Sequence, residues 1–133
     1  MARILVIDDE EMVRDTIRRA LERDGHSVGE AVDGEEGVRI FEEKEPDLVI
    51  TDILMPNKEG IETIQEICKL RPDALIIAIS GGGQMKDTSF LLPAKIFGAI
   101  SVLEKPFSLG DLKQAVDDAL ASRSPGYSKA RRS

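Results

Sequence analysis

Residues 3–9 of the chain read Arg-Ile-Leu-Val-Ile-Asp-Asp, a short run of aliphatic residues that ends abruptly in two acids. Four consecutive apolar residues are typical of a strand that is covered on both faces, as in a parallel sheet between two layers of helices. Comparable runs recur along the chain at intervals that leave room for one helix each. The pattern predicts five strands, at Arg3–Ile7, Ser27–Ala31, Asp47–Thr51, Ala74–Ile79 and Ile100–Glu104.

The segments between these runs carry apolar residues at helical spacing. Val13, Ile17 and Leu21 follow the first run at four-residue intervals, and Ser108 is a plausible N-cap for the last helix. Further helices are expected after Gly34 and Gly60, and a less regular one near Phe90. Alternating strands and helices predict an α/β fold, a doubly wound five-stranded parallel sheet for which right-handed crossovers favour the order 2-1-3-4-5.

Length and charge restrict what this fold does. The 133 residues suffice for one domain, expected over residues 1–122, and residues 123–133 form a basic tail or linker remnant. The formal net charge is −7, and every charged residue after position 118 is basic. An acidic body of this kind repels nucleic acid and anionic membranes, so neither is an expected partner of this domain.

The cysteine, histidine and apolar content of the chain excludes several kinds of metal site, disulfide-rich folds and membrane-spanning helices. Cys68 and His26 are each the single residue of their type, which excludes a disulfide framework, a cysteine-rich zinc site and a multi-histidine metal centre. No apolar run approaches the ~20 residues that span a bilayer. We therefore expect a soluble protein of a reducing compartment, the cytoplasm.

Polar residues gather where the predicted strands end. Asp8 and Asp9 follow the first strand, Asp52 the third, Ser80 the fourth and Lys105 the fifth. Carboxyl ends of parallel strands share one edge, and the predicted order places the first and third strands side by side. Three carboxylates and one ammonium leave a charge of −2, which one Mg²⁺ or Mn²⁺ balances with oxygen ligands. Attack of a carboxylate on phosphorus is then feasible.

Five segments in this order resemble the receiver domain of two-component response regulators, of the chemotaxis type, over about residues 2–121. The fold that this resemblance implies is a flavodoxin-like three-layer sandwich. Each segment is weak evidence alone, whereas five in register at strand ends are specific. The matching pieces are residues 4–10 (ILVIDDE), residues 47–56 (DLVITDILMP), Gly60, Ser80 and residues 105–107 (KPF).

The resemblance implies a role for each residue in phosphoryl transfer. Asp52 is the implied phosphoacceptor, which takes a phosphoryl group from a histidine kinase or a phosphotransfer protein. Lys105 would pair with one phosphoryl oxygen, and Ser80 would hydrogen-bond another. The bond between Lys105 and Pro106 is similar to one that is cis in the family. The domain would catalyse only its own phosphorylation and dephosphorylation and would not be an enzyme with a separate substrate.

The resemblance also implies a metal-binding set for Mg²⁺. Asp9 looks like a direct ligand, Asp8 a ligand through water, and Asp52 and the backbone carbonyl of Leu54 complete the protein ligands. Downstream, the implied partner is a protein effector or output domain, and a homodimer remains open.

Three departures from the family pattern keep other functions open. Val102 stands where the family usually has a Tyr or Phe whose rotation reports phosphorylation. Leu54 and Gly82 occupy positions that influence acyl-phosphate hydrolysis, and neither offers a polar side chain. Residues 81–83, three glycines, make the loop after the fourth strand permissive. The alternatives are a receiver-like scaffold that works without phosphorylation and a Mg²⁺-dependent phosphatase with an aspartyl-phosphate intermediate.

Overall fold

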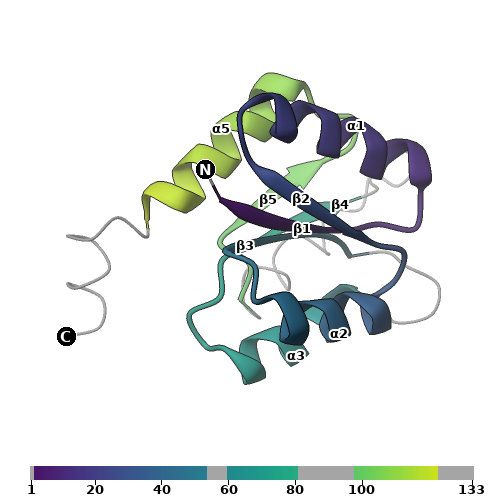
Figure 1. Cartoon of the computed structure of the whole chain (residues 1–133), viewed down its shortest axis with the longest axis vertical. Helices are drawn as coiled ribbons and strands as arrows, with labels where there is room; N and C mark the ends of the chain where they lie inside the picture. Colours follow the sequence, from purple (N-terminus) through teal and green to yellow (C-terminus); the bar gives the residue numbers. More distant parts are fainter. Residues whose placement is uncertain (1, 54–59, 81–97, 123–133) are drawn as a thin grey trace.

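A computed structural model describes residues 2–53, 60–80 and 98–122 of the chain. In these ranges five parallel strands form one sheet, and helices cover both of its faces (Figure 1). The strands are β1 (Arg3–Ile7), β2 (Ser27–Ala31), β3 (Leu48–Asp52), β4 (Ile76–Ser80) and β5 (Ser101–Glu104). The helices are α1 (Glu11–Arg23), α2 (Gly34–Lys44), α3 (Gly60–Leu70) and α5 (Leu109–Ala121).

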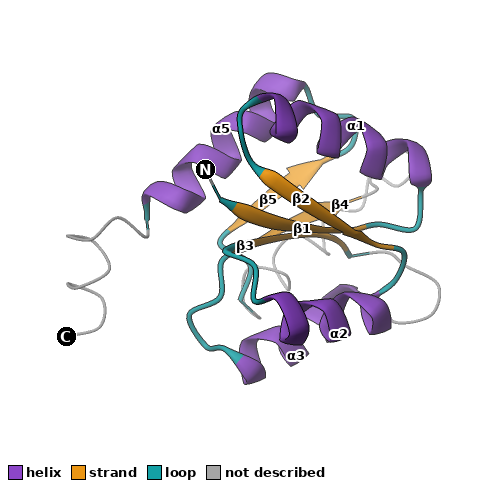
Figure 2. Ribbon diagram, viewed as in Figure 1, coloured by secondary structure: helices purple, strands orange, loops and turns teal. Residues whose placement is uncertain are grey.

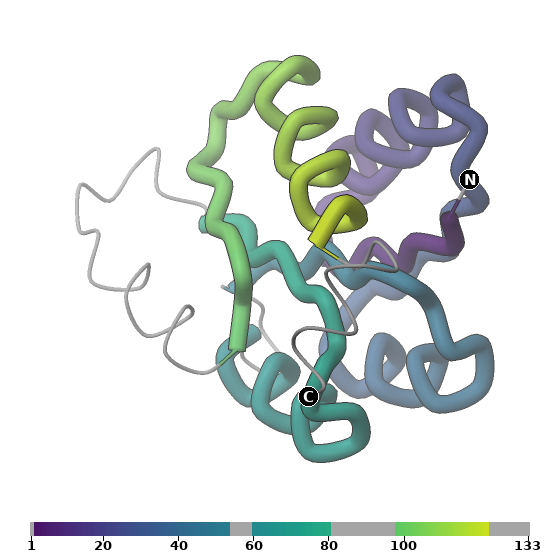
Figure 3. Tube along the Cα trace, turned by 90° about the vertical axis from the view of Figure 1, so that its left-hand side faces the viewer, coloured from purple at the N-terminus to yellow at the C-terminus, as the bar shows by residue number. Residues whose placement is uncertain are grey.

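The strand order is β2-β1-β3-β4-β5, so the predicted doubly wound α/β topology is confirmed. Helices α1 and α5 lie on one face of the sheet, and α2 and α3 lie on the other (Figure 2). The view in Figure 3 shows α1 and α5 next to each other above the sheet. None of the helices in the described ranges is long and apolar enough to cross a bilayer.

Side chains along the central strands point alternately to the two faces of the sheet and fill the core on both sides. In β1, Ile4 and Val6 pack toward α1 and α5, whereas Leu5 and Ile7 pack toward α2 and α3. Strands β3 and β4 repeat this division. Because each central strand buries both of its faces, its sequence reads as an unbroken apolar run.

The boundaries of β3 and β4 differ from the predicted ones in a way that concerns the site. Asp47 lies before β3, where its backbone N–H donates to the carbonyl oxygen of Arg3 at 2.7 Å and its Oδ2 accepts from the Arg3 N–H at 2.9 Å. At the other end, Asp52 pairs with Ile79 and therefore belongs to β3. Strand β4 similarly begins at Ile76 rather than at residue 74, and it includes Ser80. Asp52 and Ser80 are therefore held in the sheet rather than in a loop.

The last helix begins as predicted. Ser108 is the N-cap of α5, and its Oγ accepts a hydrogen bond from the Asp111 N–H at 2.9 Å. The helix expected near Phe90 and the tail after residue 122 lie outside the described residues.

Candidate functional site

Four separate strands deliver polar groups to one edge of the sheet. Asp8 follows β1, Asp52 ends β3, Ser80 ends β4 and Lys105 follows β5. The ammonium of Lys105 lies 3.2 Å from Asp8 Oδ2 and 3.3 Å from Asp52 Oδ2. These contacts join residues 53 and 97 positions apart. The predicted convergence of Asp8, Asp52 and Lys105 is therefore present.

A third carboxylate, which the sequence analysis did not single out, lies still closer to Lys105. Glu10 Oε1 is 2.8 Å from Lys105 Nζ, although 61% of the Glu10 side chain is exposed. Glu10 is also the N-cap residue of α1, and no side-chain cap is formed there. In the sequence, the feature that could have identified Glu10 is its position directly after Asp8 and Asp9 in a run of three acids. Strand geometry did not identify it because its side chain reaches the site from a helix start.

Asp9 takes a different position from the one that a direct metal ligand would suggest. The structure leaves Asp9 exposed, and the carboxylates whose oxygens lie within 4.8 Å of one another are those of Asp8, Glu10 and Asp52. The carbonyl of Leu54, the other expected direct ligand, lies outside the described residues, as does Gly82. The ligand roles of Asp9 and Leu54 therefore remain predictions.

Ser80 and its neighbours are held by backbone contacts. Ser80 is only 3% exposed, and its carbonyl oxygen accepts from the backbone N–H of Lys105 at 2.9 Å. That bond fixes the start of the segment after β5 against the end of β4. The peptide between Lys105 and Pro106 is cis, as the family resemblance implied.

Burial and charge shift the proton affinities of Asp8 and Lys105 upward. Complete burial raises the pKa of Asp8 above its ordinary value of 3.8, against the hydrogen bond from the Glu10 N–H and the charge of Lys105. Burial alone would lower the pKa of Lys105, but its contacts with Glu10, Asp52 and Asp8 raise it above 10.5. Lys105 is therefore fully charged at neutral pH, while ionised Asp8 is under-compensated.

The carboxylates of Asp8, Glu10 and Asp52 form a cluster that could hold a cation. Asp8 Oδ2 is buried and accepts no hydrogen bond of good geometry from the part of the chain that the structure describes, although Lys105 Nζ lies 3.2 Å away. A buried carboxylate oxygen without a well-formed hydrogen bond is one of the features that an ordered water or a bound ion explains. The oxygen-only donor set of Asp8, Glu10 and Asp52 suits a hard divalent cation such as Mg²⁺. The residues present therefore fit the cation that the sequence predicts.

Replacing Asp8 with Asn is expected to stabilise the metal-free protein at pH 7 by about 0.5–2 kcal/mol. Because the folded pKa of Asp8 is raised, the folded state binds the proton more tightly than the unfolded state. The wild-type free energy of unfolding then falls as pH rises from 3.8 through the folded pKa.

Urea unfolding of both proteins between pH 3 and pH 7 measures this difference. The advantage of Asp8→Asn should vanish at the acid end, where the wild-type carboxyl is protonated. Asp9→Asn makes the same change at the neighbouring exposed acid and is the matched control; its stability at pH 7 should stay within about 0.5 kcal/mol of wild type, as for most surface substitutions. A pH-independent difference for Asp8→Asn would contradict the argument.

Gly60 fixes the distance between α3 and the end of β3. A Cβ at this position would overlap the carbonyl oxygen of Asp52 and the Cα of Ile53. The Gly60 N–H also donates to the Ile53 carbonyl oxygen at 3.2 Å. The first residue of α3 therefore lies directly against the backbone that carries the Asp52 side chain.

Gly60→Ala is expected to lower the free energy of unfolding by about 1–3 kcal/mol, because the new methyl group must displace backbone. Gly29→Ala in β2 is the control, since a Cβ there has no neighbour within 4 Å. Chemical denaturation of both variants measures the contrast. Equal stabilities would show that α3 can move away from Asp52 without loss.

Comparisons with known proteins agree with this geometry. The family model described as response regulator receiver domain matches residues 4–117. The chemotaxis protein CheY of Halobacterium salinarum is 34% identical over 119 residues, which are 90% of this chain and 97% of that protein. A response regulator receiver domain from Clostridium thermocellum is 38% identical with a TM-score of 0.83, covering 92% of this chain and 97% of the other.

Other relatives are longer than this chain. The transcriptional regulatory protein PdtaR of Mycobacterium tuberculosis is 34% identical over 120 residues, which are 90% of this chain and 57% of that protein. The chain thus spans little more than half the length of this relative.

Proposed function

We propose that this chain, which belongs to the family of response regulator receiver domains, is a signalling switch that takes up a phosphoryl group on Asp52 in the presence of Mg²⁺. The phosphodonor would be a histidine kinase or a phosphotransfer protein. The chain would promote only its own phosphorylation and dephosphorylation. Its output would be a change of surface that a downstream protein or an attached output domain recognises.

One observation carries this proposal: Lys105 lies against both Asp52 and Asp8 in a nearly closed acidic site. The side chains of Asp8 and Asp52 are 0% and 4% exposed, and that of Lys105 is 17% exposed. Structural ion pairs are usually placed at the surface, where they contribute little. Three close carboxylates beside one ammonium leave an excess of negative charge, and this excess suits a site that binds a cation and an incoming phosphoryl group.

The side chains supply distinct parts of the proposed transfer. An Asp52 carboxylate oxygen attacks the phosphorus of the donor, and the bond from phosphorus to the donor nitrogen or oxygen breaks with its electron pair leaving on the donor. Lys105 already lies 3.3 Å from Asp52 Oδ2, so its ammonium is placed to neutralise a phosphoryl oxygen. Ser80, at the end of the adjacent strand, would donate a hydrogen bond to a second oxygen.

We further propose that the acids around Asp52 hold the divalent cation. Asp9 would be a direct ligand, Asp8 would act through water, and Asp52 and the Leu54 carbonyl would complete the set. Mg²⁺, or Mn²⁺ in its place, supplies charge neutralisation for the phosphoryl oxygens when bound. Glu10 belongs to the same carboxylate cluster and would compete with an incoming phosphoryl oxygen for the Lys105 ammonium.

Intact-protein mass spectrometry after incubation with acetyl phosphate tests the proposal. With Mg²⁺ the chain should gain one phosphoryl group, and with excess EDTA it should gain none. Absence of any adduct with acetyl phosphate and with a panel of phosphorylated histidine kinases would overturn it. The cytoplasm, where such kinases draw on ATP, is the compartment that the proposal implies.

Val102 supports a second candidate, a receiver-like scaffold that binds its partner without phosphorylation. Val102 is half-buried in β5, pairs in register with Ala78 and packs against the apolar cluster under α2 and α3. An aliphatic side chain in this position has no polar atom with which to report a change at Ser80. Equal partner affinity before and after phosphorylation would favour the scaffold over the switch.

A further inference from the structure

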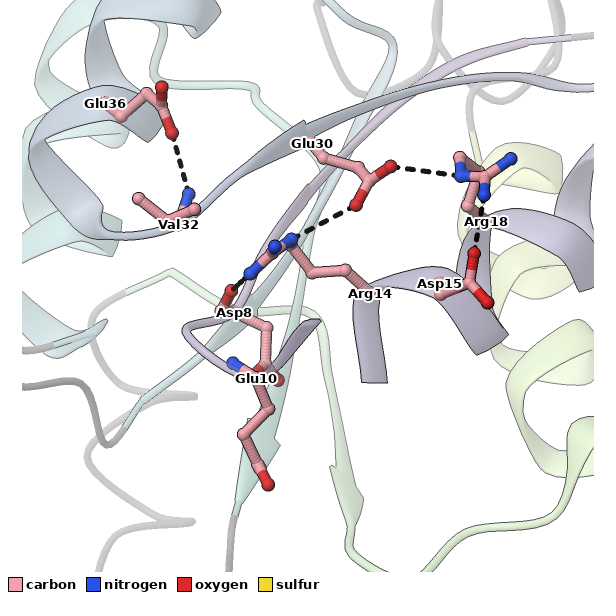
Figure 4. A network of polar contacts seen from close by, with 8 residues as sticks. All are labelled: Asp8, Glu10, Arg14, Asp15, Arg18, Glu30, Val32 and Glu36. Carbon is pink, nitrogen blue, oxygen red and sulfur yellow. Dashed lines mark hydrogen bonds and ion pairs between the residues drawn. The ribbon is translucent and has the colours of Figure 1, made fainter. Parts of the chain in front are cut away.

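Arg14 connects the acidic end of β1 to the body of the molecule. It lies in the second turn of α1, and only 12% of its side chain is exposed. Its Nη1 donates to the backbone carbonyl oxygen of Asp8 at 2.6 Å, and its Nε lies 3.1 Å from Glu30 Oε1 on β2 (Figure 4). One guanidinium thus ties the residue after β1 to the neighbouring strand.

The contact falls on the peptide that joins the two adjacent acids. The preceding peptide is held by the Asp8 N–H, which donates to the Ala31 carbonyl at 3.1 Å, and the carbonyl of the Asp8–Asp9 peptide accepts from Arg14. The backbone on both sides of the Asp8 Cα is therefore restrained. The Glu10 N–H also donates to Asp8 Oδ1 at 2.8 Å, and this second bond acts on the Asp8 side chain, whereas the Arg14 bond acts on the Asp8 backbone.

Glu30 in turn holds Arg14 in position. Its second carboxylate oxygen, Oε2, lies 3.0 Å from Arg18 Nε, so two arginines of α1 share one acid of β2 (Figure 4). Arg18 also pairs with Asp15 and Glu22 along α1. Only Arg14 of the two reaches the Asp8 backbone, whereas the ion pairs of Arg18 are with acids of α1 and β2.

We propose that Arg14 is a positioning residue for the divalent cation, held by Glu30, which fixes the Asp8 backbone at the end of β1 so that the buried Asp8 carboxylate stays in the cluster with Glu10 and Asp52. The inference rests on the proposed function, because it presumes that this site binds a divalent cation. Groups that orient the ligands of a metal commonly change its affinity by 10- to 100-fold when they are lost.

Electrostatics alone predicts the opposite change in cation affinity, so the direction of the measured change distinguishes the two explanations. Removing a positive charge beside a cation site should tighten cation binding or leave it unchanged. Loss of an orienting hydrogen bond should weaken it. Arg14→Gln and Arg18→Gln remove the same charge from the same helix and the same glutamate, and only the first removes the bond to the Asp8 carbonyl.

The dissociation constants are measured in two titrations. For Mn²⁺, electron paramagnetic resonance gives the concentration of free ion, and for Mg²⁺, binding is followed by calorimetry. We expect Arg14→Gln to weaken binding by about tenfold or more and Arg18→Gln to change it less than about twofold. Arg14→Lys keeps the charge but loses the two-pronged contact, and it should fall between wild type and Arg14→Gln. If Arg14→Gln does not fold, Arg14→Lys decides alone, because electrostatics predicts no change for it.

The outcomes separate the inference from the proposed function. Wild-type protein that binds neither Mn²⁺ nor Mg²⁺ would overturn the cation part of the proposed function and this inference with it. Wild-type binding with an unchanged or tighter constant in Arg14→Gln, or an unchanged constant in Arg14→Lys, would overturn the inference alone.

Discussion

Asp52→Asn is expected to abolish phosphorylation by acetyl phosphate and by any kinase donor. The amide that replaces the carboxylate keeps the size of the side chain but is a far weaker nucleophile toward phosphorus. Asp52 is nearly enclosed at the end of β3, and its Oδ2 already lies beside Lys105, so the substitution removes the reacting atom and leaves its surroundings in place. Mass spectrometry of the intact protein after incubation with Mg²⁺ and acetyl phosphate measures the loss.

Asp24→Asn is the matched control for this experiment. It makes the same change from carboxylate to amide at a residue that pairs with Lys113 on the surface, away from the site. This control should still gain one phosphoryl group per chain, at the wild-type rate. An adduct on Asp52→Asn, mapped by peptide sequencing to Asp8, Asp9 or Glu10, would contradict the assignment of the acceptor.

The sheet and three members of the site follow from the sequence by one physical rule. Parallel strands end at a common edge, so polar residues that follow separate apolar runs must meet there. Asp8, Asp52 and Lys105 satisfy this rule: the Lys105 ammonium lies within ion-pair distance of a carboxylate oxygen of each acid. Ser80 satisfies it through the backbone, where its carbonyl holds the Lys105 N–H.

Residues whose side chains are placed by loops and helix starts do not follow from that rule. Asp9 is adjacent to Asp8 in sequence, yet it is exposed while Asp8 is fully buried. Both residues lie beyond the end of β1, where the alternation of strand side chains no longer predicts which one is buried. Glu10 enters the site only because the chain turns into α1 at that point. Arg14 is one of several arginines in an amphipathic helix, and its spacing alone does not distinguish it from Arg18.

Lys105→Met is expected to reduce the rate of phosphorylation by about 100-fold or more, because the ammonium is a fixed positive charge where charge develops on the phosphoryl oxygens. Rapid-mixing measurements with acetyl phosphate, followed by mass spectrometry, give the rate. A rate within tenfold of wild type would show that Lys105 is not required for the transfer.

The same substitution should also destabilise the metal-free protein, by about 2–4 kcal/mol at pH 7. Loss of one partner from a buried ion pair usually costs about 3–5 kcal/mol; the smaller value is expected here because the Lys105 side chain is 17% exposed. Lys113→Met is the control, since Lys113 pairs with Asp24 at 3.4 Å on the surface and its loss should change stability by less than about 1 kcal/mol.

A second substitution separates the two roles of Lys105. Without the ammonium, the pKa of Asp8 rises further, so the stability deficit of Lys105→Met should shrink as pH falls and Asp8 takes up a proton. Adding Asp8→Asn removes the uncompensated buried charge and should recover most of the lost stability at pH 7, as urea unfolding would show. Phosphorylation should remain as slow in the double variant as in Lys105→Met, because neutralising Asp8 does not restore a cation beside the phosphoryl oxygens. Recovery of the rate together with the stability would mean that Lys105 acts on the fold and not on the transfer.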